Sequence, residues 1–254
     1  MNYENVKQQM IEFLKNETSK IGINRVTIGL SGGLDSAVVA VLAKEVFKDN
    51  MSVVLMPSYL SSKESIIDAK ELCEKFNISY EVVDISPMVK GYFDNIEDKT
   101  ALRIGNFSAR MRMSVLYDIS ARDNSLVVGT SNKSEILLGY GTLYGDTACA
   151  INPIGQIYKS DLFEFAKYIG VTDAIINKKP SADLWEGQSD EEELGFSYKQ
   201  MDSVLKLMID QNLTKKELLE KNIDEKLIDM LDHCVKSNLF KGKLPTIANI
   251  NFNY

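Results

Sequence analysis

The stretch Ser31-Gly32-Gly33-Leu34-Asp35-Ser36 (SGGLDS) joins an apolar segment to a helical one. Residues Arg25 to Ser31 (RVTIGLS) predict a buried strand, and residues Asp35 to Val46 predict a helix. Two adjacent glycines let the backbone turn tightly and come close to a ligand. The amides after them open a helix, where the helix dipole and free N–H groups favour an anion. The stretch therefore predicts a phosphate-binding loop in an α/β fold.

This loop differs from the two commonest phosphate-binding loops. It lacks the GK[ST] ending of a Walker A loop, and its glycines do not have the GxGxxG spacing of dinucleotide-binding folds. Asp35 would repel a bare phosphate, so its presence indicates a bridging Mg²⁺ ion. The alternative is a structural Gly-Gly turn in which Asp35 or Ser36 caps the helix. The place of the loop, directly after a buried strand, favours a binding site.

Further strands alternate with helices over the first 140 residues. Three more apolar stretches predict strands at Ser52–Pro57, Ser79–Ile85 and Ser125–Thr130. Ser61 with Glu64 predicts a capping box for a helix that runs to about Phe76, and a long helix is predicted at about Ile104–Ala121. Strands rich in β-branched residues, each followed by a helix, predict a doubly wound parallel sheet with helices on both faces.

The last part of the chain has a different pattern, with helices and loops and no further strand. The predicted helices lie near Ser160–Ile169, Tyr198–Leu207, Lys215–Glu220 and Glu225–Val235. We expect one domain over residues 1–254, with the sheet core at about 20–155 and a mostly helical part at 156–254. A separate small helical domain is the alternative.

The composition limits the classes of function. The 254 residues carry 44% hydrophobic side chains, 26% charged side chains and a formal net charge of −7, which gives no broad basic surface for nucleic acid. The three cysteines form no CxxC pair, which argues against a disulfide framework and a zinc site. The polar N-terminus and the lack of an apolar run of roughly 20 residues predict a cytoplasmic protein that does not contact a membrane.

Three further stretches, together with SGGLDS, carry a resemblance to a known family. SGGLDS matches the loop of the N-type ATP pyrophosphatases. The segments Gly105–Met113 (GNFSARMRM), Val128–Leu138 (VGTSNKSEILL) and Pro180–Gly195 (PSADLWEGQSDEEELG) resemble the NAD synthetases in order and spacing, most closely the short bacterial form that uses ammonia. The resemblance implies an adenine nucleotide hydrolase-like fold, Mg²⁺ as cofactor, and ATP, deamido-NAD and ammonia as substrates. It also implies a homodimer.

The resemblance implies an ATP site and a metal site. Thr130 ends the fourth predicted strand, at the sheet edge where open α/β folds bind ligands, and Glu135 follows one helical turn later. Glu135 with Asp35 would hold Mg²⁺, although Glu135 could instead only cap its helix with Asn132. Lys159 would neutralise charge on the leaving pyrophosphate, although alone it would more often be an exposed residue at a helix start. The implied ATP-binding residues are Gly29, Ser31, Gly32, Gly33, Leu34, Asp35, Ser36, Thr130, Lys159 and Ser181.

On the dinucleotide side, Asn106, Arg110 and Tyr117 have the spacing i, i+4 and i+11 and share one helix face. An amide, a cation and an aromatic ring suit an anionic aromatic ligand, although a solvated polar stripe would look the same. The resemblance implies that these three residues and Lys241 bind deamido-NAD. As a hypothesis, the catalytic residue Asp146 binds or deprotonates the incoming ammonia.

The chain departs from the family pattern at three positions on the dinucleotide side. Where the family has Lys, Asp and His, this sequence has Leu143, Ala150 and Phe240. These departures predict either a different grip on deamido-NAD, which we favour, or a shifted substrate preference. Two other functions stay open: a tRNA-modifying ATP pyrophosphatase, for which no basic surface or CxxC site is visible, and a non-catalytic nucleotide sensor.

The expected reaction forms NAD, AMP and pyrophosphate through an acyl-adenylate, as the last step of NAD biosynthesis by a C–N ligase. Such a reaction needs positioning and charge neutralisation more than a side-chain nucleophile. The sequence has one histidine, His233, which we expect to be a surface or packing residue. The chain has no room for the amidase domain of glutamine-using relatives, so ammonia is the expected nitrogen source.

Overall fold

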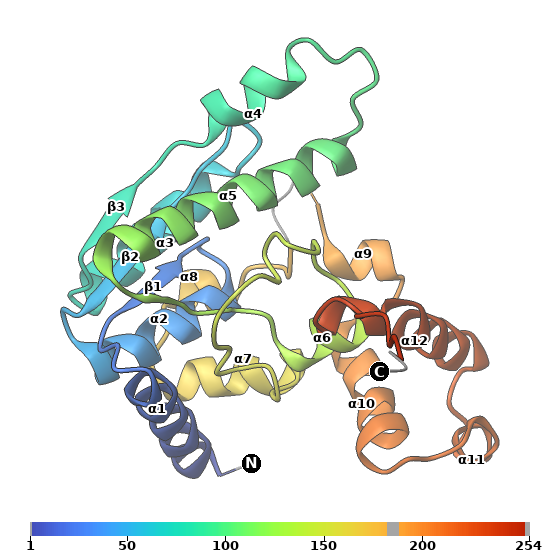
Figure 1. Cartoon of the computed structure of the whole chain (residues 1–254). Helices are drawn as coiled ribbons and strands as arrows, with labels where there is room; N and C mark the ends of the chain where they lie inside the picture. The colour runs from blue at the N-terminus through green and yellow to red at the C-terminus, as the bar shows by residue number, and fades with distance from the viewer. Residues whose placement is uncertain (1, 182–187, 252–254) are drawn as a thin grey trace.

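A computed structural model describes residues 2–181 and 188–251, and it contains a four-stranded parallel sheet (Figure 1). The strands are paired in the order β3-β2-β1-β4. Their bounds are β1 Val26–Gly29, β2 Met51–Leu55, β3 Tyr80–Val82 and β4 Leu126–Val127. The predicted parallel α/β sheet is confirmed, with β1 in the interior of the sheet between β2 and β4.

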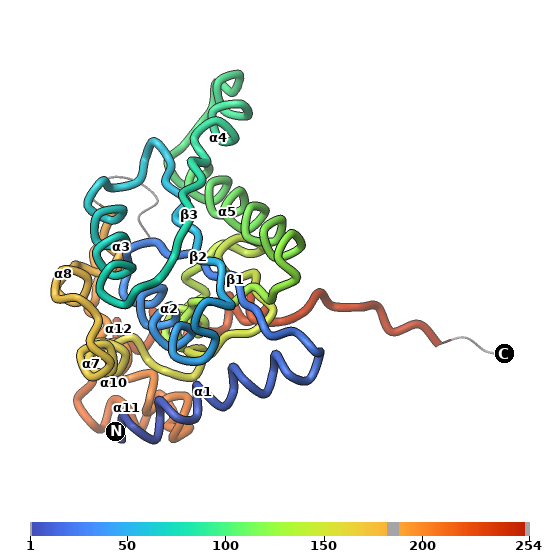
Figure 2. Tube along the Cα trace, turned by 90° about the vertical axis from the view of Figure 1, so that its left-hand side faces the viewer, coloured from blue at the N-terminus to red at the C-terminus, as the bar shows by residue number. Residues whose placement is uncertain are grey.

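Helices cover both faces of this sheet (Figures 1 and 2). Successive residues of β2 alternate between the faces: Val53 and Leu55 join one buried cluster, and Val54 joins another. On the first face lie α1 (Tyr3–Lys20), α2 (Leu34–Phe47), α3 (Lys63–Lys75) and α7 (Lys159–Tyr168). On the second face lie α4 (Ser86–Phe93) and α5 (Ala101–Asp123).

The C-terminal helices surround a second hydrophobic core beside the sheet (Figure 1). Met201, Leu205 and Leu231 are fully buried there, and Tyr158 and Leu138 join them from the preceding part of the chain. The helices are α6 (Lys133–Leu138), α10 (Tyr198–Leu205), the π-helix η1 (Lys206–Asp210), α11 (Lys215–Glu220) and α12 (Glu225–Asn238). Shorter segments are α8 (Asp173–Ile176), α9 (Asp190–Leu194) and η2 (Leu239–Gly242). In this arrangement α7 packs on the sheet core through Leu162 and contacts α6 and α10 of the helical core.

Several local predictions differ from the structure. The N-cap of α3 is Ser62, whose hydroxyl accepts a hydrogen bond from Ser65 N, and not Ser61. Ser61 instead accepts a hydrogen bond from Ser58 N in the turn before the helix. The fourth strand is only two residues long, since beyond it Val128 makes an isolated bridge to Ile151. Among the described residues, no helix is long and apolar enough to cross a membrane.

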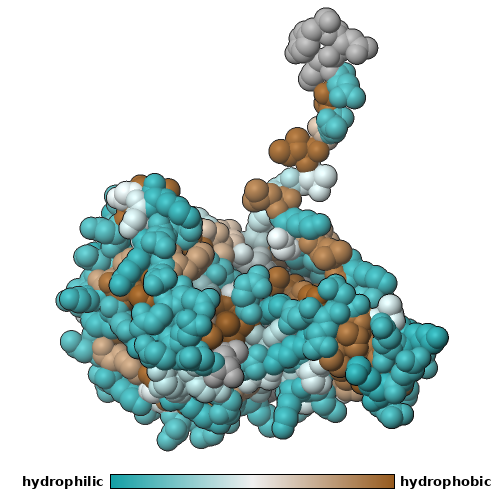
Figure 3. Space-filling view, turned by 90° about the horizontal axis from the view of Figure 1, so that it is seen from below, coloured by the Kyte–Doolittle hydropathy of each residue, from teal (hydrophilic) through white to brown (hydrophobic). Residues whose placement is uncertain are grey.

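The C-terminal segment 243–251 leaves the body of the molecule without forming a helix or strand (Figure 2). Its apolar side chains Leu244, Ile247 and Ile250 are exposed, and Figure 3 shows brown side chains along this projecting tail. By contrast, the body of the molecule in that view is mainly hydrophilic on its surface. The tail therefore packs on neither hydrophobic core.

Candidate active site

The predicted phosphate loop connects the carboxyl end of β1 to the N-terminus of α2. Gly32 has φ +80°, and a Cβ at this position would overlap the carbonyl oxygen of Ser65 on α3, so only glycine fits. The N-cap of α2 is Gly33, with no side-chain cap among the described residues. Neither Asp35 nor Ser36 therefore has the N-cap role of the structural alternative, and the first amides of α2 are available to an anion.

Hydroxyl groups fix the shape of this loop. Ser31 Oγ lies 3.0 Å from Ser36 Oγ and accepts a hydrogen bond from Gly33 N at 3.1 Å. Ser36 Oγ accepts from Ser31 N at 3.2 Å and lies 3.1 Å from Gly33 O, to which it donates. The hydroxyl groups thus support the loop from within, and Ser36 is buried while Ser31 stays exposed.

A cavity of about 560 Å³ opens at the carboxyl end of the sheet and contains the loop. The cavity brings together most of the residues that the sequence singled out, although they come from seven segments of the chain. Its lining includes Gly29, Ser31, Gly32, Gly33, Leu34, Asp35, Ser36, Asn106, Thr130, Glu135, Asp146, Lys159, Ser181 and Lys241. Open α/β folds bind ligands at this edge of the sheet.

The charged centre of the cavity consists of Asp35, Glu135 and Lys159. The Lys159 ammonium forms an ion pair with Asp35 and a second one, at 3.3 Å, with Glu135. Lys159 is buried, with 4% of its surface exposed, so it is not the exposed helix-start residue that the sequence left open. Its ammonium also lies 5.5 Å from the centre of the Tyr198 ring. One buried cation thus neutralises part of the charge of two carboxylates that belong to α2 and α6.

Asn132 holds this centre in place, a contact that the sequence did not indicate. Its side-chain oxygen caps α6 by accepting from Glu135 N at 3.1 Å, and its side-chain nitrogen donates to Asp35 Oδ1 at 2.9 Å. Glu135 completes the predicted capping box, because its Oε2 accepts from Asn132 N at 3.3 Å. One carboxylate oxygen of Glu135 therefore caps α6, as one of the two sequence interpretations expected, and the other oxygen faces Lys159. The role of Glu135 in holding Mg²⁺ stays a prediction.

Burial and mutual charge shift the pKa values of this centre. Desolvation and the nearby Asp35 carboxylate together raise the pKa of Glu135 to about 8, against the opposing effect of Lys159. Burial alone would lower the pKa of Lys159, but the carboxylates of Asp35 and Glu135 outweigh it and raise this pKa. Lys159 therefore stays protonated, and Glu135 holds its proton to a higher pH than an ordinary carboxyl does.

The donor set fits a magnesium ion that is shared with a nucleotide. Mg²⁺ in nucleotide sites is commonly bound by one or two carboxylates together with substrate phosphates. Asp35 and Glu135 lie close enough to contact the same ammonium, and both line the cavity beside the phosphate loop. The described residues contain no group of three or more His, Cys, Asp or Glu side chains that could hold a metal ion.

Asp146 also lines this cavity. Its Oδ1 accepts a hydrogen bond from Thr142 N at 2.9 Å, and Thr142 Oγ1 in turn donates to Asn106 at 2.8 Å. Lys241 also lines the cavity, and its ammonium donates to Gly139 O at 2.7 Å and Gly141 O at 3.2 Å. The Asp146 residue is exposed, but the protein atoms around its carboxyl displace water from it. This desolvation raises the pKa of the carboxyl.

Comparison with known proteins shows the family of the chain. The family model described as NAD synthase matches residues 6–245. The chain belongs to the NAD synthase family. It is 51% identical to the NH3-dependent NAD synthetase of Wolinella succinogenes over 95% of this chain and 94% of that protein. It is 46% identical to the enzyme of that name from Campylobacter jejuni, over 98% of this chain and 100% of that protein.

Solved structures of the NAD synthase family have the same fold. The NH3-dependent NAD synthetase of C. jejuni, in complex with nitrate, has a TM-score of 0.85 and 40% identity, and NMN synthetase from Francisella tularensis has a TM-score of 0.88 and 30% identity. Both alignments cover 98% of this chain and 100% of the other. The family's adenine nucleotide hydrolase-like α/β fold is therefore the fold of this chain, as the sequence predicted.

Within this NAD synthase fold, the predicted dinucleotide-binding face of α5 lies along the loop at residues 142–149. Asn106 contacts Thr142, and Arg110 donates to Leu143 O at 3.2 Å. Tyr117 is 40% exposed, and its pKa is raised by burial and, to a smaller extent, by the Cys149 thiol. Only Asn106 of the three lines the cavity. The roles of Arg110 and Tyr117 in binding deamido-NAD stay predictions.

Arg112 is a cavity residue on α5 that the sequence did not single out. Its guanidinium donates to Met56 O and to Ser61 Oγ, each at 3.0 Å. Arg112 thereby joins α5 to the loop after β2, next to the phosphate loop. The pattern Arg-x-Arg in GNFSARMRM could have indicated a separate role for Arg112. Residues two apart on a helix point to different faces, so Arg112 cannot share the face of Arg110.

The three departures from the NAD synthase pattern lie near the surface. Ala150 and Phe240 are exposed, and Leu143 is half-buried with its carbonyl bound by Arg110. None of the three lines the cavity as the described residues define it. His233 is exposed on α12, as expected for a surface residue. Residues 182–187, which belong to the stretch PSADLWEGQSDEEELG, lie outside the described residues.

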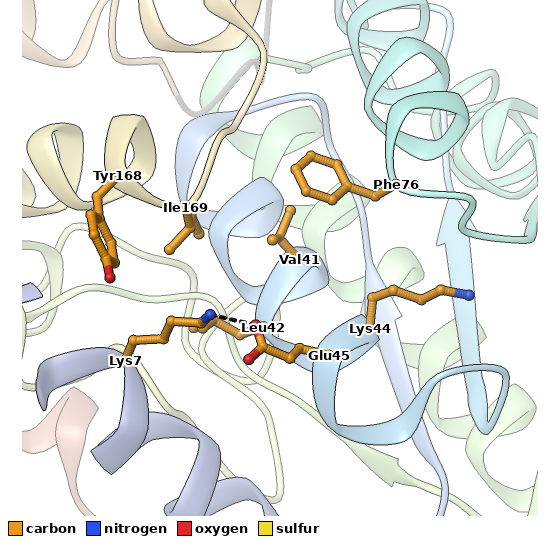
Figure 4. Close-up of a pocket in the computed structure, with 8 residues that line it drawn as sticks. All are labelled: Lys7, Val41, Leu42, Lys44, Glu45, Phe76, Tyr168 and Ile169. Carbon is orange, nitrogen blue, oxygen red and sulfur yellow. Dashed lines mark ion pairs between the residues drawn. The ribbon is translucent and has the colours of Figure 1, made fainter. Parts of the chain in front are cut away.

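A second, smaller cavity of about 370 Å³ lies at the other end of α2, away from the phosphate loop (Figure 4). Figure 4 shows the ion pair between Lys7 and Glu45, at 2.8 Å, and the rings of Phe76 and Tyr168 on its walls. It contains none of the residues that the sequence singled out. The large cavity is therefore the candidate active site.

Proposed function

We propose that the chain catalyses the ATP-dependent amidation of deamido-NAD by ammonia, giving NAD, AMP and pyrophosphate through an acyl-adenylate. The observation that carries the proposal is the position of Asp35, Glu135 and Lys159 around the phosphate loop, in a chain that is about half identical to NH3-dependent NAD synthetases. The reaction makes this protein a C–N ligase at the last step of NAD biosynthesis.

In the first step, the nicotinate carboxylate attacks the α-phosphate of ATP and pyrophosphate leaves. The amides at the start of α2 and the buried Lys159 ammonium are placed to bind the phosphates and the charge that grows on the leaving group. Asp35 and Glu135 would hold the Mg²⁺ that neutralises phosphate charge when it is bound. Thr130 and Ser181, at the cavity wall, are the further ATP contacts of the proposal.

In the second step, ammonia attacks the adenylated carboxyl and AMP leaves. Ammonium must lose a proton before it attacks, and a carboxylate near the reacting carbon can bind the cation and accept that proton. Asp146 supports this role because it lies in the cavity, is held by Thr142 N and has a raised pKa. A higher pKa makes a carboxylate a better base at neutral pH.

Deamido-NAD would bind along α5 and the loop at residues 139–149. Asn106 and Lys241 line the cavity, Arg110 donates to Leu143 O in this loop, and Tyr117 lies seven residues further along the helix. A cation and an aromatic ring on one helix face complement an anionic aromatic ligand. Leu143, Ala150 and Phe240 cannot make the charged or polar contacts of the family pattern, so this grip would rest mainly on Arg110 and Lys241.

A mononucleotide carboxylate is the second candidate substrate. Two observations favour including it: the departures on the dinucleotide side and the fold similarity to NMN synthetase from F. tularensis, with a TM-score of 0.88. The mononucleotide lacks the adenylate half of deamido-NAD, so it is a smaller ligand with fewer groups to contact. Its amidation would use the same ATP loop, charged centre and Asp146.

The proposal also includes a homodimer in the cytoplasm. The exposed face of α5 carries Leu102 and Tyr117, and burial of such side chains between two copies would be favourable. Size-exclusion chromatography with light scattering tests the dimer, which would elute with twice the chain mass of 28.5 kDa. A mass of one chain at micromolar concentration would contradict it.

The experiment that tests the function measures AMP and NAD formed by purified protein from ATP, Mg²⁺ and deamido-NAD. Parallel reactions supply ammonium or glutamine, and a second series replaces deamido-NAD by nicotinic acid mononucleotide. NAD and AMP formed in equal amounts with ammonium would support the proposal. Product from the mononucleotide alone would shift the substrate, and AMP without any amide product would overturn the amidation.

A further inference from the structure

The N-terminus of α7 carries Lys159 as its first residue, and the helix lacks a cap of its own. Tyr158 occupies the N-cap position and makes no side-chain cap hydrogen bond. The first N–H groups of a helix need acceptors, especially where they are buried, because an unpaired buried donor is unfavourable. The backbone of the residue that bears the central cation of the site therefore depends on acceptors from other parts of the chain.

Asp202, on α10, provides those acceptors. Its Oδ2 accepts a hydrogen bond from Ser160 N at 2.7 Å, and its Oδ1 accepts from Ser134 Oγ at 2.6 Å. Ser134 Oγ in turn accepts from Lys159 N at 2.9 Å. Asp202 is fully buried, and so is Ser134. One carboxylate of α10 thus caps α7 directly and also through the hydroxyl of Ser134 on α6.

The same helix also contacts the other end of Lys159. Tyr198 lies one turn before Asp202 on α10, so the two side chains share a face. Its ring lies 5.5 Å from the Lys159 ammonium, and its hydroxyl lies 3.2 Å from Asp190. Asp202 also joins α6, which carries Glu135, to α7. Two charged groups of the site are therefore set relative to each other through one buried carboxylate.

We propose that Asp202 is a positioning residue for catalysis: by capping α7 from α10, it fixes the Lys159 ammonium relative to Glu135 and the phosphate loop. The inference rests on the proposed function, since Lys159 receives its role in pyrophosphate release there. Displacement of a catalytic group by about 1 Å can lower a rate about 100-fold. Asp202 itself does not line the cavity.

The test compares Asp202→Asn with Asp161→Asn by the rate of AMP formation and by ATP KM. The asparagine has the same shape, but its amide nitrogen is a donor, so it cannot accept from both Ser160 N and Ser134 Oγ. Asp161 is the matched control, because its ion pair with Lys206, at 2.8 Å, also joins α7 to the segment that follows α10 but does not reach Lys159 N. We expect D202N to lower kcat about 100-fold with a smaller change in KM, and D161N to stay within about threefold of wild type.

A double-mutant cycle with Lys159→Ala separates positioning from general stability. If Asp202 acts through Lys159, D202N slows AMP release much less in the K159A background than alone, measured with radiolabelled ATP over long incubations. Ser134→Ala removes the hydrogen bonds of this hydroxyl to Lys159 N and Asp202 but leaves the bond from Ser160 N to Asp202, and we expect at least a tenfold loss. If D202N does not fold, as judged by circular dichroism, S134A with the same cycle decides.

The outcomes are distinguishable from failure of the proposed function. If wild-type protein forms no AMP from ATP and a pyridine carboxylate, the proposed function fails. If wild type is active while D202N and S134A stay within about threefold of it, or lose the same factor in the K159A background, the positioning role is overturned.

Discussion

At the residue scale, three charged side chains at the centre of the cavity define its chemistry. They are Asp35, Glu135 and Lys159, which lie up to 124 residues apart in the sequence, and the cation of the three is buried. The types of these residues were predictable from the resemblance of the sequence to a family, but their ion pairs were not. A local pattern carries no information on a contact between α2 and α7, and the same holds for the link from Asn132 to Asp35.

Replacement of Asp146 by Asn tests its role in the second step. We expect amide formation to fall about 100-fold, as for loss of a general base, while pyrophosphate release in the absence of ammonia changes less than about threefold. Quenched reactions with labelled ATP measure both steps. Asp118→Asn, on the exposed surface of α5, is a control for unspecific loss. Equal loss in both steps would remove Asp146 from ammonia chemistry.

Glu135 predicts a pH dependence of stability. Its pKa in the folded protein, about 8, exceeds the ordinary value of 4.5, so the folded state binds more protons than the unfolded state between these pH values. The contribution of this carboxyl to the free energy of unfolding therefore falls as the pH rises through this window. We expect the stability of wild type relative to Glu135→Gln to fall by about 1 kcal/mol or more between pH 5 and about pH 8.

Urea unfolding of both proteins at these pH values measures the difference. Because the glutamine does not titrate, groups common to both proteins cancel. A difference that stays constant with pH would mean that Lys159 keeps Glu135 ionised throughout.

At the element scale, helices and strands with strong local patterns were predictable, and short ones were not. The bounds of α11 agree with the prediction because Thr214 and Glu217 form a capping box. In contrast, α4 was not predicted, since it has only eight residues and a proline in its first turn. The longer α1 was not predicted either, although Met10, Ile11 and Leu14 form a buried stripe. The assignment of Ser61 as a cap was wrong by one residue because adjacent serines compete for the same role.

We expect the two glycines of the loop between β1 and α2 to differ in how well they tolerate replacement by alanine. Gly32→Ala adds a Cβ that overlaps the Ser65 carbonyl, at a φ of +80°. We expect a loss of about 2 kcal/mol or more in the free energy of unfolding. Gly33→Ala is the matched control, because its φ is −94° and its Cβ would lie 3.2 Å from Ser31 Oγ, the nearest neighbouring atom. Here we expect a loss below about 1 kcal/mol.

Urea unfolding of the two variants side by side measures these losses. If G32A were as stable as G33A, the close approach of the loop to α3 would not exist in solution.

At the scale of the whole molecule, two hydrophobic cores meet at α7, which contacts both α2 and α10. The sheet core includes Leu42, and the helical core includes Leu231. Leu162 of α7 belongs to the first core, whereas Tyr158, directly before α7, belongs to the second. The sequence indicated a change of pattern near residue 156, but patterns along a chain do not show how two groups of helices pack. The expectation of one domain over residues 1–254 stays a prediction.

This arrangement predicts one cooperative unfolding transition. Leu42→Ala and Leu231→Ala each remove a fully buried side chain, and each should lower the free energy of unfolding by about 2–5 kcal/mol. We expect each variant to shift a single transition, with far-UV and near-UV circular dichroism changing together in urea. If L231A separates into two transitions while L42A does not, the helical part is an independent domain.

The ammonium of Lys159 has a consequence for the order in which ligands arrive. It acts as an internal counter-ion, so Asp35 and Glu135 do not present a bare dianion to the solvent. A free divalent cation would have to compete with this ammonium, and we expect its affinity for the empty protein to be low. The phosphates of a nucleotide can bind the ammonium in place of the carboxylates. We therefore expect the metal ion and ATP to bind together. In the protein without ligands, Lys159 thereby already neutralises part of the charge that a metal ion would otherwise meet.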